Sequence, residues 1–99
     1  MSNLTSYELQ FLPSALKEWR RLDATVKEQF KQRLAARLIH PHVETARLHG
    51  MPGCYKIKLR AIGYRLVYRV DERAITVVVV AVGKRERESV YRSALLRLN

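Results

Sequence analysis

The chain has 99 residues, enough for one domain with a modest hydrophobic core and too few for a second. Nineteen Lys and Arg against nine Asp and Glu give a formal charge of +10, which predicts an anionic partner: nucleic acid, an anionic membrane or an acidic protein. The longest apolar run, from Ile75 to Gly83, is too short to span a bilayer, and the first ten residues lack the pattern of a secretion signal. A single cysteine, Cys54, excludes an internal disulfide and is typical of a reducing compartment. We therefore expect residues 1–99 to form one cytoplasmic domain with no membrane anchor.

The first half of the chain predicts a strand followed by two helices. Residues 6–12 alternate between apolar and polar side chains, as a short strand does. A proline opens the first helix, at 13–21. Asp23 and Thr25 are both candidate N-caps for the second helix, which Pro41 closes. An apolar stripe recurs every four residues along that helix and should face the sheet: Val26, Phe30, Leu34 and Leu38.

The second half predicts three consecutive strands and a helix. Two strands lie within Cys54 to Arg69, and a turn at Asp71–Arg73 leads to a third, Ile75 to Val82. That third strand is apolar on both parities, so it should be an interior strand covered on both faces. The charged segment 84–88 then leads into a last helix ending near Leu98. The order β-α-α-β-β-β-α predicts an α+β fold, with an antiparallel four-stranded sheet, two N-terminal helices and a C-terminal helix.

The segment from Cys54 to Arg69 carries the strongest functional pattern. Its apolar residues have odd numbers in the first strand and even numbers in the second, so residues paired across the hairpin should sum to an odd number. The simplest loop is Ala61 to Tyr64. The pairs expected with that loop are Arg60 with Arg65, Lys58 with Val67, and Lys56 with Arg69. Five cations then share one face. Because like charges opposed in a sheet are destabilising, an anion-binding use is favoured over a merely solubilising one.

Other residues give weaker signals. Lys84 and Arg85 follow Gly83 and should come within reach of the hairpin cations, although an ordinary charged loop explains them equally well. His40 and His42 flank a proline and are expected to diverge rather than to converge on one phosphate. The chain has one cysteine, no zinc-ligand spacing, few carboxylates and none of the common nucleotide or hydrolase motifs. We therefore expect neither a metal nor another cofactor.

Three segments carry a family resemblance: LKEWRRL (16–22), LHGMPGCYKIKLRAIGYRLVYRV (48–70) and AVGKRERESVYRSAL (81–95). They resemble the RelE family of bacterial toxins, and the similarity runs from about Phe11 to the end of the chain. The resemblance implies a microbial-ribonuclease-like α+β fold. It also implies a metal-independent mRNA interferase that cuts mRNA in the ribosomal A site. The implied protein partner is an acidic RelB-like antitoxin, with operator DNA bound only by the toxin–antitoxin complex.

The resemblance also implies a set of site residues. The matching positions of this sequence are Lys56, Lys58, Arg65, Arg85 and Tyr91. Supporting RNA contacts are expected from Arg60, Arg69 and Lys84. Further basic residues on the two N-terminal helices are candidates for contacts with ribosomal RNA, or are simply solvated faces: Lys17, Arg20, Arg21, Lys27, Lys31 and Arg33.

Metal-free RNA cleavage by the 2′-OH needs a base, cations that stabilise the phosphorane charge, and a group that serves the leaving oxygen. We assign Lys58 as the base, because repulsion from Lys56, Arg60, Arg65 and Arg85 favours its neutral form, although a bound phosphate acts in the opposite direction and the sequence does not give the sign of the net shift. Arg85 serves the leaving oxygen, chiefly by its charge. Lys56 and Arg65 hold the phosphate, and Tyr91 stacks on a base or orients the sugar.

Two other functions remain open from the sequence. A ParE-like toxin would share the fold and act on DNA gyrase, although toxins of that kind lack the Lys, Arg and Tyr set. A non-catalytic RNA- or ribosome-binding module would bind without cutting.

Overall fold

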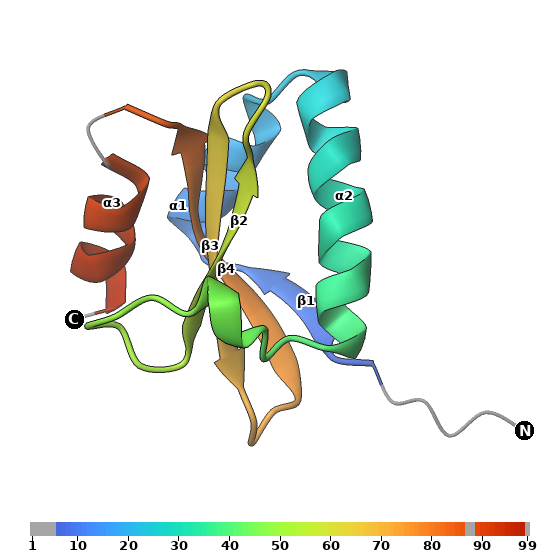
Figure 1. The fold of residues 1–99 in the computed structure, drawn as a ribbon, viewed down its shortest axis with the longest axis vertical. Coiled ribbons are helices and arrows are strands. Elements are labelled where there is room, and N and C mark those ends of the chain that lie inside the picture. Colours follow the sequence, from blue (N-terminus) through green and yellow to red (C-terminus); the bar gives the residue numbers. More distant parts are fainter. Residues whose placement is uncertain (1–5, 87–88, 99) are drawn as a thin grey trace, which may run out of the picture.

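The computed structural model describes residues 6–86 and 89–98 of the chain. The order β-α-α-β-β-β-α is confirmed, with one short 3-10 helix added in the loop after the second helix (Figure 1). The elements are β1 (Glu8–Phe11), α1 (Pro13–Arg20), α2 (Ala24–Ile39), the 3-10 helix (Glu44–Ala46), β2 (Cys54–Leu59), β3 (Tyr64–Asp71), β4 (Thr76–Lys84) and α3 (Ser89–Leu98). Of the charged segment 84–88, residues 87 and 88 lie outside the described residues.

The four strands form one sheet in the order β1-β4-β3-β2. The strand β4 is interior, as its apolar sequence predicted. The sheet is not wholly antiparallel, however: β2–β3 and β3–β4 pair antiparallel, but β1 pairs parallel to β4. The two helices return the chain to the end of the sheet where β1 began, so β2 runs in the direction of β1. Two hairpin reversals then give β4 that direction again.

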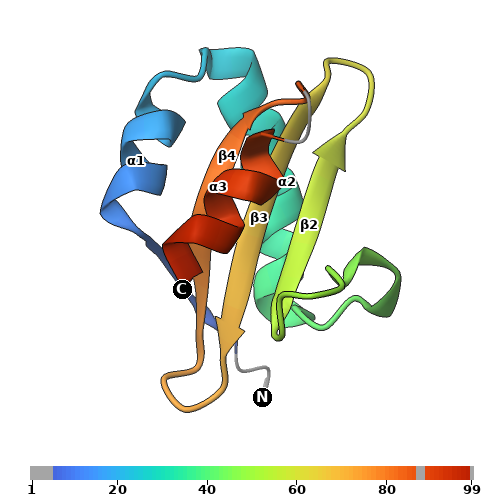
Figure 2. The same ribbon diagram turned by 90° about the vertical axis from the view of Figure 1, so that its left-hand side faces the viewer.

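Helices cover both faces of this sheet (Figures 1 and 2). The core between the sheet and α2 contains the buried members of the predicted stripe, Val26, Phe30 and Leu34, together with Ile57 and Leu66. Of the two candidate caps, Asp23 is the N-cap of α2, and its Oδ1 accepts a hydrogen bond from the Val26 N–H at 3.0 Å. The helix α3 covers the other face, where a second, smaller core includes Val67, Val80, Ala81, Val90 and Ala94.

A bulge in β4 changes which residues face α3. Val67 pairs with Ala81 and Tyr68 pairs with Val79, so Val80 has no opposite residue in β3. Beyond the bulge, Gly83 lies beneath α3, because a Cβ placed there would be 3.4 Å from Val90 Cγ2. The absence of a side chain at Gly83 leaves room between the end of the sheet and α3.

An ion pair fastens α3 to the rest of the fold. Arg97 on α3 donates two hydrogen bonds to the Glu18 carboxylate on α1, at 2.8 and 2.9 Å, and a third to the Val80 carbonyl oxygen at 2.8 Å. Glu18 also accepts from the Val82 N–H at 3.1 Å. The pair therefore gives hydrogen-bond partners to the backbone of β4 beyond its pairing with β1. It also joins α1, β4 and α3.

The opposite end of the sheet is held by an aromatic cluster. The Tyr68 hydroxyl donates to the Pro41 carbonyl oxygen at 2.7 Å and accepts from Arg37 at 2.8 Å, and Tyr55 stacks on Tyr68 with ring centroids 5.6 Å apart. His42 hydrogen-bonds Tyr55 and Glu72, so its ring joins the loop after α2 to this cluster. No helix within the described parts of the chain is long and apolar enough to cross a membrane.

Candidate active site at the end of the sheet

Strand alternation places Lys56, Lys58, Arg65 and Arg69 on one face of the hairpin and leaves Arg60 in the turn, in a register that differs from the prediction. Lys58 lies opposite Arg65, Lys56 opposite Val67, and Cys54 opposite Arg69. The predicted parity is confirmed, because paired numbers sum to an odd value. The predicted pairs of Arg60 with Arg65, Lys58 with Val67 and Lys56 with Arg69 are wrong, since the loop is residues 60–63 and not 61–64. Gly63 sets this position: its φ is +72°, and its N–H donates to the Leu59 carbonyl oxygen at 2.9 Å.

A cavity of about 210 Å³ opens between this end of the sheet and α3. Four of the five predicted site residues line it together with Lys84 and Val90: Lys58, Arg65, Arg85 and Tyr91. They come from β2, β3, the segment after β4 and the first turn of α3. Lys56 lies two residues before Lys58 in β2, outside the lining of this cavity.

Arg65 is the buried cation of the cavity, with 6% of its surface exposed. Its Nη1 donates to the Tyr64 carbonyl oxygen at 3.1 Å. Among residues 6–86 and 89–98, no carboxylate lies within ion-pair distance of it. A buried cation without a counter-ion is costly to the folded state. The arrangement is therefore typical of a site that receives its anion from a ligand.

Lys58 has a lowered pKa. The largest cause is repulsion from Lys56, followed by partial desolvation and then by Arg60, Arg65 and Arg85. These are the four cations that the sequence named as its neighbours. The direction follows because a like charge disfavours the protonated ammonium. The cavity therefore contains a lysine whose neutral form is more accessible than that of an isolated lysine.

Arg85 and Tyr91 are held at the cavity by different means. The Arg85 N–H donates to the Gly63 carbonyl oxygen at 2.7 Å, so the hairpin turn fixes the backbone that carries this exposed guanidinium. Tyr91 packs partly buried against the second core and also lines the cavity. The arrangement offers cations on several sides of one small space, with an aromatic ring beside them.

Comparisons with known proteins identify the family of this chain. The model of the family described as "ParE toxin of type II toxin-antitoxin system, parDE" matches residues 9–89. The mRNA interferase toxin RelE of Escherichia coli K12 is 53% identical over 93 residues, which are 94% of this chain and 98% of that protein. The chain belongs to the RelE/ParE toxin family.

Solved structures place the fold within the RelE/ParE family as well. A mutant of E. coli RelE in the free state superposes with a TM-score of 0.88 at 49% identity, covering 96% of this chain and all of that one. The toxin in the intact E. coli RelBE toxin–antitoxin complex superposes with a TM-score of 0.80 at 54% identity, covering 83% of this chain and all of that one. The expected RelE-like α+β fold is confirmed.

The three supporting residues expected of this RelE/ParE toxin lie in different places. Lys84 lines the cavity. Arg60 lies in the hairpin turn and lines a separate groove on the other side of β2. Arg69 lies at the far end of the hairpin, beside Gly50 and Leu95, in a pocket that shares no residue with the cavity. The structure thus brings Lys84 to the predicted site and leaves Arg69 away from it.

Three further polar residues of this toxin were not predicted as site residues. Gln29 and Arg37 line the groove beside Arg60, and Arg37 also donates to the Lys56 carbonyl oxygen at 3.2 Å. Glu18 supports the site at a distance, through its pair with Arg97 on α3. Gln29, Arg33 and Arg37 recur at intervals of four, a spacing that a helical reading could have recognised. Within the described ranges, no group of three His, Cys, Asp or Glu residues could hold a metal ion.

Proposed function

We propose that this toxin is a ribosome-dependent mRNA interferase, an endoribonuclease that cuts mRNA in the ribosomal A site. The observation that carries the proposal is the cavity, where Lys58, Arg85 and Tyr91 surround the buried Arg65, which has no carboxylate partner among residues 6–86 and 89–98. Identity of 53% to a protein named as an mRNA interferase toxin supports the same reaction class. Cleavage stops translation and growth in the cytoplasm, where translated mRNA is the substrate.

The reaction is metal-independent attack of a ribose 2′-OH on the adjacent phosphate. Lys58 in its neutral form takes the hydroxyl proton, and the lowered pKa of Lys58 increases the share of molecules able to do so. Arg65 and Lys56 bind the phosphate and stabilise the charge that grows on its oxygens. The O5′–P bond then breaks and the departing O5′ takes a proton from solvent water, while Lys58 returns its proton to solvent, leaving a 2′,3′-cyclic phosphate and a 5′-hydroxyl.

Arg85 and Tyr91 complete the assignment. Arg85 lies exposed at the mouth of the cavity and stabilises the departing 5′ oxygen by charge and hydrogen bonding. Tyr91 stacks on a splayed base or orients the sugar. No residue of this set is a strong acid at neutral pH, so much of the rate must come from holding the RNA in line for attack. The A site supplies that geometry, and the ribosome is therefore part of the active enzyme.

The partner that silences the toxin is an acidic antitoxin of the RelB kind. The E. coli RelBE complex is named as a toxin–antitoxin complex, and its toxin is 54% identical to this chain. A chain with formal charge +10 and a cationic cavity attracts an acidic polypeptide. Operator DNA is bound by the toxin–antitoxin complex, with the antitoxin as the DNA-binding component.

Primer extension on mRNA translated in a purified system tests the proposal. The wild-type chain should produce cuts at A-site codons, whereas Lys58→Gln combined with Arg85→Gln should abolish them. Arg73→Gln removes one exposed positive charge from the turn before β4 and should cut normally. Ribosome binding without any cuts would show a non-catalytic module, and rapid cutting of naked RNA would contradict the need for the ribosome.

The family description also names ParE, so DNA gyrase is the competing target. A supercoiling assay distinguishes the two functions. We expect no inhibition of gyrase by the wild-type chain at concentrations that stop translation. Inhibition that survives the double substitution would assign the toxin to the gyrase-directed group.

A further inference from the structure

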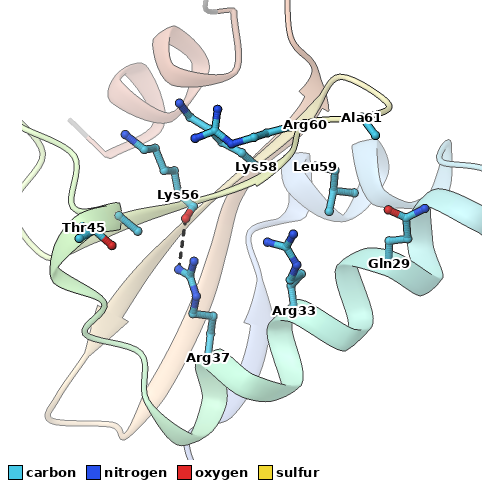
Figure 3. Close-up of a pocket in the computed structure, with 10 residues that line it drawn as sticks. Gln29, Arg33, Arg37, Thr45, Lys56, Lys58, Leu59, Arg60 and Ala61 are labelled. Atoms are coloured by element: carbon cyan, nitrogen blue, oxygen red, sulfur yellow. Dashed lines mark hydrogen bonds between the residues drawn. The ribbon is translucent and has the colours of Figure 1, made fainter.

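A second cationic depression lies on the other side of β2 from the catalytic cavity (Figure 3). It has a volume of about 370 Å³ and lies between α2 and the free edge of β2. We name it the edge groove. Its polar lining comes from α2, the 3-10 helix, β2 and the hairpin turn: Gln29, Arg33, Arg37, Thr45, Lys56, Lys58 and Arg60.

Cations approach the edge groove from both sides of β2. Figure 3 shows Arg33 and Arg37 reaching from α2 toward the strand, while Lys56 and Lys58 leave the opposite side of it. No acidic residue lines the groove in the described part of the chain. Two acidic residues adjoin lining residues in sequence, Glu28 and Glu44, and Glu44 pairs with Arg47 at 3.1 Å. Five positive charges therefore flank the edge of β2, two on the α2 side and three on the other, and no carboxylate lies among the described residues that line the groove.

The backbone of β2 adds hydrogen-bond donors to this groove. The Val70 N–H donates to the Gly53 carbonyl oxygen, so odd-numbered residues of β2 bond to β3 and even-numbered ones face the free edge. The outward-facing Lys56 carbonyl oxygen already accepts a hydrogen bond from Arg37 at 3.2 Å. The next outward-facing amide is that of Lys58, at the centre of the groove.

Arg33 and Arg37 differ in how far they are already engaged. Arg37 donates to the Tyr68 hydroxyl and to the Lys56 carbonyl oxygen, so it has a structural role, and neither partner neutralises its charge. Arg33 is exposed, and its side chain makes no hydrogen bond or ion pair to any residue that the structure describes. Its planar guanidinium can bind two phosphate oxygens at once. Arg33 is therefore the residue whose removal tests the groove without disturbing the fold.

Lys58 lines both the edge groove and the catalytic cavity. We propose that the edge groove binds a second phosphate of the substrate RNA strand, so that the strand passes over the edge of β2 from the cavity toward α2. This inference rests on the proposed function, because it takes the RNA held in the cavity as its starting point. A phosphodiester chain suits the groove because its charges recur along the strand, and the cations recur along α2 and β2.

Binding of uncleavable RNA to the isolated chain tests the proposal. The probes are a trinucleotide and a nonanucleotide, both fully 2′-O-methylated so that the attacking hydroxyl is absent. Arg33→Gln should weaken binding of the nonanucleotide about fivefold, the size of one exposed charge pair. It should also reduce the slope of log affinity against log salt by about 0.7. The trinucleotide, which fills only the cavity, should bind Arg33→Gln and wild type equally. Arg73→Gln, with the same loss of charge, should bind both probes like wild type.

Three results would overturn the proposal. Equal weakening of both probes would mean that Arg33 acts through the cavity or through net charge. If Arg33→Gln bound both probes like wild type but bound ribosomes more weakly, the groove would be assigned to ribosomal RNA. If it bound both probes like wild type but formed a weaker antitoxin complex, the groove would be assigned to the protein partner. Because these probes cannot be cut, their binding is separate from the A-site cleavage assay, which alone decides the proposed function.

Discussion

The backbone N–H of Arg85 donates a hydrogen bond to the carbonyl oxygen of Gly63 at 2.7 Å. This bond joins the turn between β2 and β3 to the segment that leaves β4. It makes the position of one cavity cation depend on a turn in which no cavity residue lies. Gly63 has φ +72°, and a Cβ added there would meet no atom within 4 Å. The requirement for glycine is therefore conformational rather than steric.

Gly63→Ala should lower both stability and cleavage. The left-handed backbone costs an L-residue about 1 kcal/mol, so the free energy of unfolding should fall by about that amount. Cleavage should also fall, because the turn that places Arg85 is strained. Gly50→Ala is the matched control, since Gly50 has φ +84° with no atom near its Cβ and lies outside the cavity. Equal losses of cleavage in both variants would contradict the link from Gly63 to Arg85. Urea unfolding and primer extension provide the two measurements.

The hairpin register shows how much of the strand pairing can be predicted from the sequence. Alternation of Ile57 and Leu59 with Leu66 and Tyr68 fixed the parity of pairing, because an incorrect parity would bury the lysines. Parity cannot choose between loops 60–63 and 61–64, which have equal length. The choice depends on the left-handed conformation of Gly63 and its bond to Leu59. The parallel pairing of β1 was missed for a similar reason, since strand direction at a sheet edge leaves no local pattern.

The cavity was partly predictable for the same physical reasons. Strand alternation alone placed Lys58 and Arg65 on one face. The burial of Arg65 was not predictable, because it depends on α3 covering the end of the sheet. The position of Arg37 in the edge groove was not predictable from the sequence either, because its hydrogen-bond partners are 19 and 31 residues away.

The lowered pKa of Lys58 should rise toward its ordinary value in Lys56→Gln, because repulsion from Lys56 is its largest cause. The folded chain holds the Lys58 proton less tightly than the unfolded chain does. The free energy of unfolding therefore rises as the pH increases through the interval below about 10.5, the ordinary value. NMR titration of the lysine side chains measures the shift directly. Lys84→Gln is the control, since Lys84 is not among the causes of the shift. An unchanged Lys58 titration in Lys56→Gln would contradict the electrostatic argument.

The Glu18–Arg97 pair should make the fold sensitive to acid. Burial alone would raise the pKa of Glu18, but hydrogen bonds from Arg97 and Val82 outweigh it, and the pKa is lowered from its ordinary value of 4.5. The stabilisation is therefore complete above about pH 4.5 and is lost as the pH falls through the lower folded-state value. Glu18→Gln should reduce the free energy of unfolding at pH 7 by about 1 to 2 kcal/mol.

Two comparisons identify the effect as that of the Glu18–Arg97 pair. The difference between wild type and Glu18→Gln should shrink as the pH is lowered below 4.5. Glu44→Gln breaks an exposed pair with Arg47 and should change stability by less than about 1 kcal/mol. Denaturant unfolding at several pH values measures all three proteins. A difference for Glu18→Gln that did not depend on pH would show that packing, and not charge, holds α3.

Arg65→Met should stabilise the fold while it removes the activity. Arg65 is 6% exposed and has no carboxylate partner among the described residues, so the folded state carries the desolvation cost of its charge. Methionine has a similar length and no charge, and the free energy of unfolding should rise by about 1 kcal/mol despite the lost bond to the Tyr64 carbonyl oxygen. Cleavage should fall at least 100-fold, because a preorganised cation at the phosphate is lost.

Arg60→Met is the matched control for Arg65→Met, because Arg60 is exposed in the hairpin turn and carries no desolvation cost to relieve. It should leave stability within about 0.5 kcal/mol of wild type. Guanidinium chloride unfolding and primer extension compare the two substitutions. A destabilised Arg65→Met would mean that the fold needs the guanidinium. A stabilised but inactive one would mean that the toxin keeps Arg65 at a cost to its own stability, because the buried charge is compensated when the phosphate of the substrate binds.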